Sequence, residues 1–362
     1  MASPSLRPAG AQAPSLSAHV ISHFLLLLVC ASFVAVASAG SSGSCSWQGW
    51  RDVPGGAAAA SSLGIIRVDP SGQSGNFTTV QSAIDAIPED NKHWVCIYVK
   101  EGTYREKVHI PENKPFIILK GRGKRKTEIV WDDHETIVQS PTFTSLAGNI
   151  VVKSISFRNS YNNPVNDNPR TPAVAAMISG DKSYFYRVGF WGMQDTLWDV
   201  EGRHYFKRCT IQGAVDFIFG AGQSIYEGCS ISVIGNALSA GLSGYITAQG
   251  REGQNDPNGF VFKHCNVFGF GRALLGRPWR AHARVLFYYS NFTKVVDPLG
   301  WDAWSFVGQE HQLTLAEFGC FGPGADLSRR VSWETKLDVA TVERLTSLSY
   351  IDSEGWLAST PF

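Results

Sequence analysis

The chain has 362 residues, of which 44% are hydrophobic and 17% are charged, a balance that predicts a folded protein and excludes an intrinsically disordered chain. Its 32 Lys and Arg residues are matched by 31 Asp and Glu residues, and the sequence lacks a Lys/Arg-rich run of the length that binds phosphate backbones. A general nucleic-acid-binding protein is therefore excluded. The 36 glycines and the aromatic content of 12% indicate many turns and many strands.

The N-terminus predicts a secretory signal peptide over residues 1–39. An apolar run, Phe24–Ala37, ends in Ala37-Ser38-Ala39, which has the small-residue pattern of a cleavage site. A membrane anchor is the alternative, but spanning a bilayer takes about 20 apolar residues and this run is shorter. We therefore expect the mature chain to begin near Gly40 and expect no membrane partner.

A Gly-, Ser- and Ala-rich segment follows the signal peptide, and residues 40–63 are predicted to form a flexible linker. Residues 64–362 then show the dense, short apolar runs of a folded domain. Two glycosylation sequons lie in this domain, Asn76-Phe77-Thr78 and Asn291-Phe292-Thr293. Together with the signal peptide they predict a secreted, extracellular glycoprotein.

The first element of this domain is a predicted helix. Apolar residues between Phe77 and Ile87 recur at helical spacing, and Thr78 with Gln81 could form a capping box at the start. Short apolar runs then predict strands at Val95–Val99, Phe116–Leu119 and Ile150–Phe157.

A repeat follows between residues 150 and 292. In each unit a bulky apolar residue ends a short strand-like run, and these residues are Phe157, Phe190, Ile211, Ile231 and Val267, with steps of 33, 21, 20 and 36 residues. Two steps near 20 between longer ones predict a solenoid whose turns carry insertions of different length. Since no helical pattern separates the strands, we predict an all-β fold, a parallel β-helix with short flanking helices. A large β-sandwich is the alternative, but it does not predict near-constant spacing.

The seven cysteines include Cys30 in the signal peptide, and none form a C-x-x-C pair or a His/Cys cluster with zinc-site spacing. We therefore expect no metal. Cys229 and Cys265 hold the same repeat position on neighbouring turns, which places their Cα atoms within a disulfide's reach of roughly 4.4–6.8 Å. Cys209 is a competing partner, and a ladder of reduced, buried cysteines is an equal alternative.

Two aspartates occupy equivalent positions in successive repeats. Asp195 lies five residues after Phe190, and Asp216 lies five residues after Ile211. Because adjacent strands lie about 4.8 Å apart, the two carboxyl groups should be side by side. Like charges that close cannot both ionise freely, so one proton tends to be shared. The pair predicts a carboxylate nucleophile beside a carboxylic acid that can donate a proton.

An isolated Asp in a turn more often caps the backbone. Asp216, however, is followed by Phe217-Ile218-Phe219, and an Asp in so apolar a run needs a partner to tolerate burial. Arg277 is the candidate, because its planar guanidinium can hold and orient a carboxylate.

Four motifs resemble, in order and spacing, the signature motifs of plant pectin methylesterases: Gly102-Thr103-Tyr104-Arg105-Glu106, Gln194-Asp195-Thr196-Leu197, Asp216-Phe217-Ile218-Phe219-Gly220 and Leu275-Gly276-Arg277-Pro278-Trp279. Thr247-Ala248-Gln249-Gly250-Arg251 is similar to a further stretch common in that family. The resemblance covers about residues 64–362. Many plant relatives carry an N-terminal helical inhibitor-like domain, and we expect this chain to be a form that lacks it.

The resemblance implies a right-handed parallel β-helix that needs no cofactor. It also implies a pectinesterase that hydrolyses the methyl esters of pectin and releases methanol, in cell wall modification and pectin catabolism. Asp216 would attack the ester carbonyl, and Asp195 would protonate the departing methanol and then activate water. Gln194 would donate to the developing oxyanion, and Arg277 would hold Asp216 in place.

The resemblance further implies a substrate cleft lined by aromatic side chains. Trp279 would stack on a sugar ring, and Trp198, Phe219 and Trp301 would line the cleft beside it; ordinary core packing is the alternative for these rings. We expect a monomer whose partner is pectin, with a proteinaceous pectinesterase inhibitor as a further partner.

One motif departs from the family pattern. Pro172-Ala173-Val174-Ala175 stands where the family usually has Gln-Ala-Val-Ala, so the side chain that would supply a second oxyanion donor is missing. A catalytically weak, pectin-binding β-helix is therefore one alternative function, although retention of Gln194, Asp195, Asp216 and Arg277 favours the esterase. A pectin depolymerase on the same fold is the other, but we find no second acidic cluster for a glycosidase or for a lyase's calcium.

Overall fold

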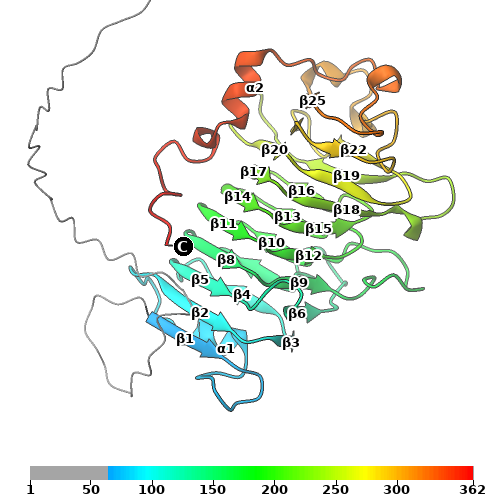
Figure 1. The fold of residues 1–362 in the computed structure, drawn as a ribbon. Coiled ribbons are helices and arrows are strands. Elements are labelled where there is room, and N and C mark those ends of the chain that lie inside the picture. The colour runs from blue at the N-terminus through cyan, green and yellow to red at the C-terminus, as the bar shows by residue number, and fades with distance from the viewer. Residues whose placement is uncertain (1–63, 362) are drawn as a thin grey trace, which may run out of the picture. The chain divides into compact units, whose positions relative to one another are not determined.

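Short strands stack in register, coil upon coil, in the computed structural model, which describes residues 64–361 (Figure 1). Each coil passes in turn through three parallel sheets, called A, B and C here, and the chain therefore forms a parallel β-helix. The predicted all-β fold is confirmed. The predicted signal peptide and linker lie outside the described residues.

Sheet A has ten strands: β1 (Gly64–Val68), β2 (Val95–Val99), β5 (Ile117–Lys120), β8 (Ile150–Lys153), β11 (Ser183–Tyr186), β14 (Arg203–Lys207), β17 (Gln223–Glu227), β20 (Gly259–Lys263), β23 (Arg284–Tyr288) and β25 (Thr314–Phe318). Sheet B has eight: β3 (Gly102–Arg105), β6 (Thr127–Trp131), β9 (Ser156–Asn159), β12 (Gly189–Trp191), β15 (Thr210–Gly213), β18 (Ser230–Ile234), β21 (Asn266–Phe270) and β24 (Asn291–Phe292). Sheet C has seven: β4 (Val108–Ile110), β7 (Phe143–Ser145), β10 (Ala176–Ile178), β13 (Leu197–Asp199), β16 (Ile218–Gly220), β19 (Gly244–Gln249) and β22 (Ala273–Pro278).

The predicted repeat is present in sheet B. Phe157, Phe190, Ile211, Ile231 and Val267 pair in register on successive strands, and all five are fully buried. The unequal steps between them arise from loops of different length between strands that keep one register. The predicted strand Ile150–Phe157 is two strands, β8 and β9, because the chain turns at Ser154, whose φ is 54°.

A column of aromatic rings fills the interior. Phe185, Phe206, Tyr226, Phe262 and Phe287 stack with centroid separations of 4.8, 4.6, 4.5 and 4.4 Å between neighbours. Because strands of a sheet are spaced by nearly the same distance, identical positions on successive coils place rings in face-to-face contact. This column fixes the register that aligns the turns carrying the site.

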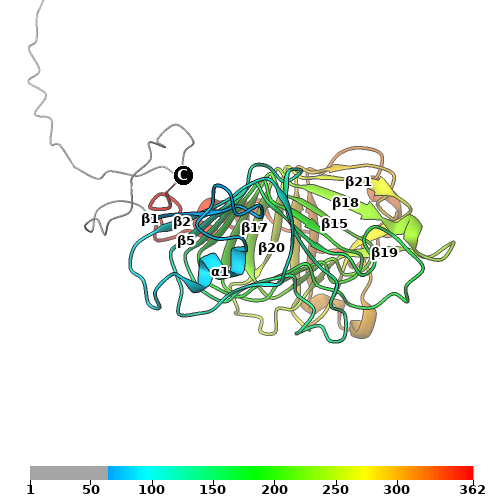
Figure 2. The same cartoon turned by 90° about the horizontal axis from the view of Figure 1, so that it is seen from below.

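The helices close the ends and one face. Helix α1 (Val80–Asp85) packs against β1, β2 and β4 and buries Val80, Ala83 and Ile84. Figure 2 shows this helix at the end of the stack that holds the first strands. Its N-cap is Thr79, which accepts a hydrogen bond from the Ser82 amide, so the predicted Thr78–Gln81 capping box is wrong by one residue. Helix α2 (Val339–Thr346) begins after the N-cap Asp338.

The C-terminal segment covers the outer face of sheet A. Leu345, Ile351 and Trp356 form one apolar cluster with buried strand residues such as Tyr205 and Val261. Single 3₁₀ turns complete the fold at η2 (Gly235–Ala237), η3 (Trp304–Phe306), η4 (Glu310–Gln312), η5 (Leu327–Arg329) and η6 (Leu348–Tyr350). Within residues 64–361, neither α-helix has the length and apolar character needed to cross a bilayer.

The predicted Cys229–Cys265 disulfide is wrong, and the alternative, a reduced cysteine ladder, is what the structure shows. Cys209, Cys229, Cys265 and Cys320 are free thiols. Cys209, Cys229 and Cys265 hold equivalent positions on successive coils, and each thiol donates to a main-chain carbonyl at 3.2–3.4 Å. In-register parallel strands hold equivalent side chains side by side about 4.8 Å apart. A disulfide needs Cβ atoms roughly 3.5–4.5 Å apart and turned toward each other.

Candidate active site

The two predicted aspartates lie in turns between sheets B and C. Asp195 precedes β13 and Asp216 precedes β16, and the pairing of Leu197 with Ile218 puts the aspartates opposite each other on adjacent coils. The amide of Asp195 also donates to the Val215 carbonyl at 3.0 Å. The predicted juxtaposition of the two carboxyl groups is therefore present.

Arg277 on β22 binds Asp216 through two hydrogen bonds. Its Nε donates to Oδ1 at 2.9 Å and its Nη2 donates to Oδ2 at 2.5 Å. The guanidinium lies between two aromatic rings, 4.1 Å from the centroid of Tyr245 and 3.9 Å from that of Trp304. Such stacking restrains a planar cation while leaving its edge free to bind a carboxylate.

A further carboxylate fixes this aromatic pair. Asp302 accepts a hydrogen bond from the Tyr245 hydroxyl at 2.9 Å and another from the Trp304 amide at 2.8 Å. Sequence reasoning missed Tyr245, Trp304 and Asp302, because none of them lies in a motif. The three residues come close to Arg277 only because the coils stack.

Burial sets the protonation of the pair. Asp195 is only 7% exposed, and burial, with the charge of Asp216 as a second cause, raises its pKa to about 8. Burial also raises the pKa of Asp216, but the two Arg277 hydrogen bonds act in the opposite direction. Asp216 is therefore the carboxyl group that ionises first, and Asp195 keeps its proton at neutral pH.

Gln194 and Pro172 lie next to this pair. Gln194 directly precedes Asp195, and its main-chain carbonyl accepts a hydrogen bond from the Ala173 amide at 3.2 Å. Ala173, the residue after Pro172, therefore places this segment beside Gln194 on the adjacent coil. Proline offers neither a side-chain donor nor an N–H at this position.

Three of the four predicted aromatic residues gather on the outer face of sheet C. The rings of Trp198 and Phe219 stack with centroids 5.3 Å apart, and Trp279 meets Phe219 edge-on at 6.0 Å. Trp279 is 37% exposed. Gly250 allows this placement, because a Cβ there would lie 2.8 Å from the Trp279 ring.

The prediction that Trp301 lines the substrate face is wrong. Its side chain is 1% exposed and packs in the core, 6.2 Å from the Phe287 ring. Trp301 pairs with Gly276 on β22, so its ring follows the inward side of the coil. Three residues later, Trp304 is 43% exposed and stacks on Arg277 instead.

The outward-facing positions that hold Phe219 and Trp198 continue along sheet C toward the N-terminal coils. Met177 pairs with Trp198 on one side and with Thr144 on the other, and Thr144 pairs with His109. A pocket lies at this end, lined by Met177, Thr144 and His109 together with Val138 and other residues. The outer face of sheet C therefore offers a surface long enough for an extended ligand.

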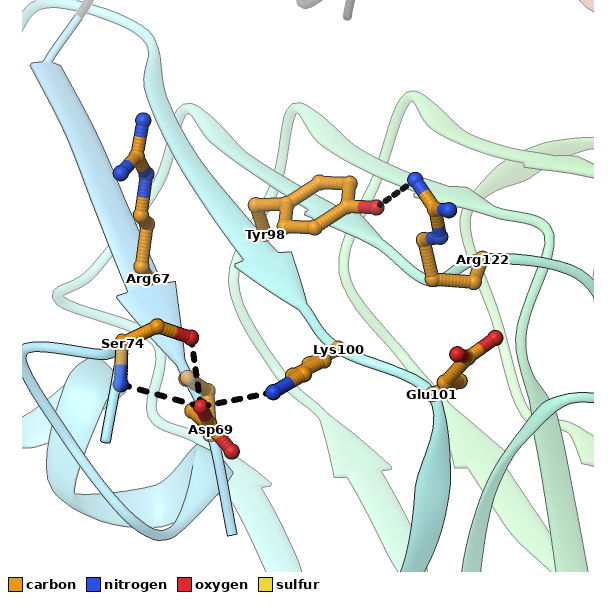
Figure 3. Close-up of a pocket in the computed structure, with 8 residues that line it drawn as sticks. Arg67, Asp69, Ser74, Tyr98, Lys100, Glu101 and Arg122 are labelled. Carbon is orange, nitrogen blue, oxygen red and sulfur yellow. Dashed lines mark hydrogen bonds and ion pairs between the residues drawn. The ribbon is translucent and has the colours of Figure 1, made fainter. Parts of the chain in front are cut away.

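A second pocket, near the first coils, holds a different arrangement (Figure 3). Asp69 accepts hydrogen bonds from Ser71 and Ser74 and binds Lys100 at 3.0 Å. These contacts, led by the Ser74 hydroxyl, hold the pKa of Asp69 well below its ordinary value. The pKa of Asp69 is thus lowered, whereas burial raises the pKa values of Asp195 and Asp216.

Comparisons with known proteins agree on one family. The family model described as Pectinesterase matches residues 67–354. "Probable pectinesterase 29" of Arabidopsis thaliana is 61% identical over 300 residues, which cover 82% of this chain and 89% of that protein. "Probable pectinesterase 55" of the same plant is 60% identical, with 82% and 91% covered. Among solved structures, a pectin methylesterase from carrot is similar with a TM-score of 0.76 and 30% identity, over 84% of this chain and 98% of that one.

Proposed function

This chain belongs to the pectinesterase family, and we propose that it removes methyl groups from methyl-esterified homogalacturonan by ester hydrolysis at Asp216 and Asp195. The observation that carries this proposal is the buried carboxyl pair, of which one member is held ionised by Arg277 and the other has a pKa of about 8. A nucleophile and a proton donor are thereby present together at neutral pH.

The first half-reaction forms an acyl-enzyme. A carboxylate oxygen of Asp216 attacks the carbonyl carbon of the C6 methyl ester, and negative charge develops on the carbonyl oxygen. Gln194, next to Asp195, is the side chain we assign to stabilise that charge. As the carbon–methoxy bond breaks, Asp195 gives its proton to the methoxy oxygen and methanol leaves.

The second half-reaction reverses the role of Asp195. Its carboxylate takes a proton from water, and the resulting hydroxide attacks the acyl carbon. The bond to Asp216 breaks, which regenerates the Asp216 carboxylate and leaves a galacturonic acid in the polymer. Arg277 binds the Asp216 carboxylate before and after the reaction, so we assign it a positioning role.

The aromatic surface fits a sugar polymer. Trp279, with Trp198 and Phe219 beside it, offers rings on which pyranose faces can stack, and the pocket beyond Met177 extends that surface. We further propose that the protein is secreted to the cell wall, acts as a monomer and meets a proteinaceous inhibitor there.

The two sequons differ in accessibility. Asn76 is exposed, whereas Asn291 is half-buried and donates through Nδ2 to Asn266 at 2.7 Å. We propose Asn76 as the better glycosylation acceptor.

Methanol release measured beside chain shortening on methylated pectin tests the proposed reaction. Wild-type protein should release methanol without shortening the polymer, and Asp216→Asn should lose nearly all release while remaining folded. Asp167→Asn, at an exposed acid, is the matched control and should behave as wild type. Chain shortening would favour a depolymerase, and binding without methanol would favour a pectin-binding protein.

A further inference from the structure

A group of cations gathers where the coils turn from sheet A to sheet B. Lys124, Arg125 and Lys126 lie in the loop between β5 and β6, Arg187 lies between β11 and β12, and Arg208 lies between β14 and β15. We call these five residues the basic turn surface. Asp195 and Asp216 lie instead in the turns between sheets B and C, so the two sites are separate.

Specific contacts hold Lys124 against the neighbouring coils. Lys124 Nζ donates to the Thr210 hydroxyl at 2.6 Å, and the Lys124 carbonyl accepts from the Ser156 hydroxyl at 2.5 Å. The loop therefore lies across the coils that carry Arg187 and Arg208. Burial lowers the pKa of Lys124, and the neighbouring charges of Arg125 and Arg187 lower it further.

Arg187 and Arg208 repeat one position along the stack. Both have a left-handed backbone, with φ of 54° and 55°, and the Arg187 amide donates to the Lys207 carbonyl on the next coil at 3.0 Å. Equivalent positions on adjacent coils lie about 4.8 Å apart. Arg187 and Arg208 thus place two positive charges side by side on adjacent coils.

Nearby acids do not neutralise this surface. Within the described part of the chain, none of the five cations forms an ion pair. The neighbouring acids already have partners, since Glu128 binds Arg158 at 2.9 Å and Glu227 binds Lys207 at 3.1 Å. Unpaired cations that lie close together repel each other, and this repulsion costs free energy. An anionic ligand would relieve the repulsion.

A pocket beside these cations adds a sugar-binding element. Lys124, Arg125 and Lys126 line it together with Arg158 and the half-buried indole of Trp191. An indole next to cations suits a ligand that has both an apolar pyranose face and a carboxylate.

From this arrangement we propose that the basic turn surface binds demethylated galacturonan, a linear polymer with one carboxylate on each ring. The inference rests on the proposed function, because this polyanion is its product. Binding at a second site would keep the enzyme on stretches that it has already demethylated while the catalytic face is free for the next ester. Fully methylated pectin has no charge and should not bind there.

Binding to immobilised polygalacturonate at low and physiological salt tests the proposal. The test variant combines Arg125→Gln, Lys126→Gln and Arg187→Gln. The matched control combines Lys294→Gln, Arg329→Gln and Arg344→Gln, which removes three exposed cations from other surfaces. Since an exposed ion pair changes an equilibrium by a factor of about 2–5, the test variant should bind roughly 10- to 100-fold more weakly, and more so at low salt. The control should stay near wild type.

Equal weakening of polygalacturonate binding in both triple variants would overturn the proposal, since it would assign binding to net charge. Unchanged binding by the test variant would also overturn it, since it would assign binding to another surface. The proposal would also be overturned if the wild type bound fully methylated pectin appreciably and the test variant did not. Methanol release from a short methylated oligogalacturonide should be the same in all three proteins. Failure of the wild type to release methanol would contradict the proposed function, and the polygalacturonate comparison would still report on the surface itself.

Discussion

Asp195→Asn should stabilise the protein increasingly as pH rises from about 4 to about 7. The pKa of Asp195 is about 8 in the folded chain against an ordinary value of 3.8. Between these values the folded state holds one more proton than the unfolded state, so the stability of the wild type falls with rising pH. The slope is about 1.4 kcal/mol per pH unit for one proton, or roughly 4 kcal/mol in all by pH 7 as an upper bound. Asparagine has nearly the same shape and cannot ionise, so the variant avoids that loss.

Chemical denaturation of wild type and Asp195→Asn across this pH range measures the effect. The two free energies of unfolding should be similar near pH 4 and separate steadily toward pH 7, with the variant the more stable. Asp167→Asn, which removes an exposed carboxylate, should follow the wild type throughout. A difference that does not change with pH, or a variant less stable at pH 7, would refute a protonated Asp195 in the folded protein.

Four further predictions concern activity and the thiols. The kcat for methanol release should fall as pH rises through about 8, because Asp195 loses the proton it donates; a flat profile across this range would reject Asp195 as the acid. Pro172→Gln should raise kcat and leave KM nearly unchanged in steady-state assays, because an oxyanion donor strengthens only in the transition state, and one donor is typically worth on the order of 10²–10³. An unchanged kcat would mean that the oxyanion is already fully solvated by other donors. Trp304→Ala should lower kcat up to about 30-fold by releasing one face of Arg277, because a cation–π contact is worth about 0.5–2 kcal/mol. Trp301→Phe, a core change, is the contrasting control and should affect stability more than kcat. After unfolding without reductant, alkylation should label the four free cysteines, Cys209, Cys229, Cys265 and Cys320. Protection of any two of them would show a disulfide.

Features that depend on the repeat could be predicted from the sequence. The spacing of Phe190 and Ile211 sets the register of sheet B, and that register alone brings Asp195 opposite Asp216. Features outside the repeat could not. Residues 293–313, between β24 and β25, lie outside the repeat, so the sequence did not distinguish the inward ring of Trp301 from the outward ring of Trp304.

The disulfide and the basic turn surface show two other limits. Two residues at the same repeat position are predicted to lie close together. In parallel strands, however, their side chains also point in the same direction and not toward each other, which is why Cys229 and Cys265 stay reduced. The basic turn surface includes only a three-residue run in the sequence, Lys124 to Lys126. Arg187 and Arg208 lie next to this run only because the coils stack. Their positions in the sequence do not reveal this proximity.

Backbone geometry explains why asparagine, and not alanine, should replace the two aspartates. Both residues have left-handed conformations, with φ of 59° at Asp195 and 47° at Asp216. Asp and Asn tolerate this region better than other non-glycine residues, since their short polar side chains can bond locally. An alanine would add backbone strain to the loss of the carboxyl group, and reduced activity could then come from a displaced turn. Asparagine keeps the conformation and the shape, so any loss of methanol release reports on the charge and the proton alone.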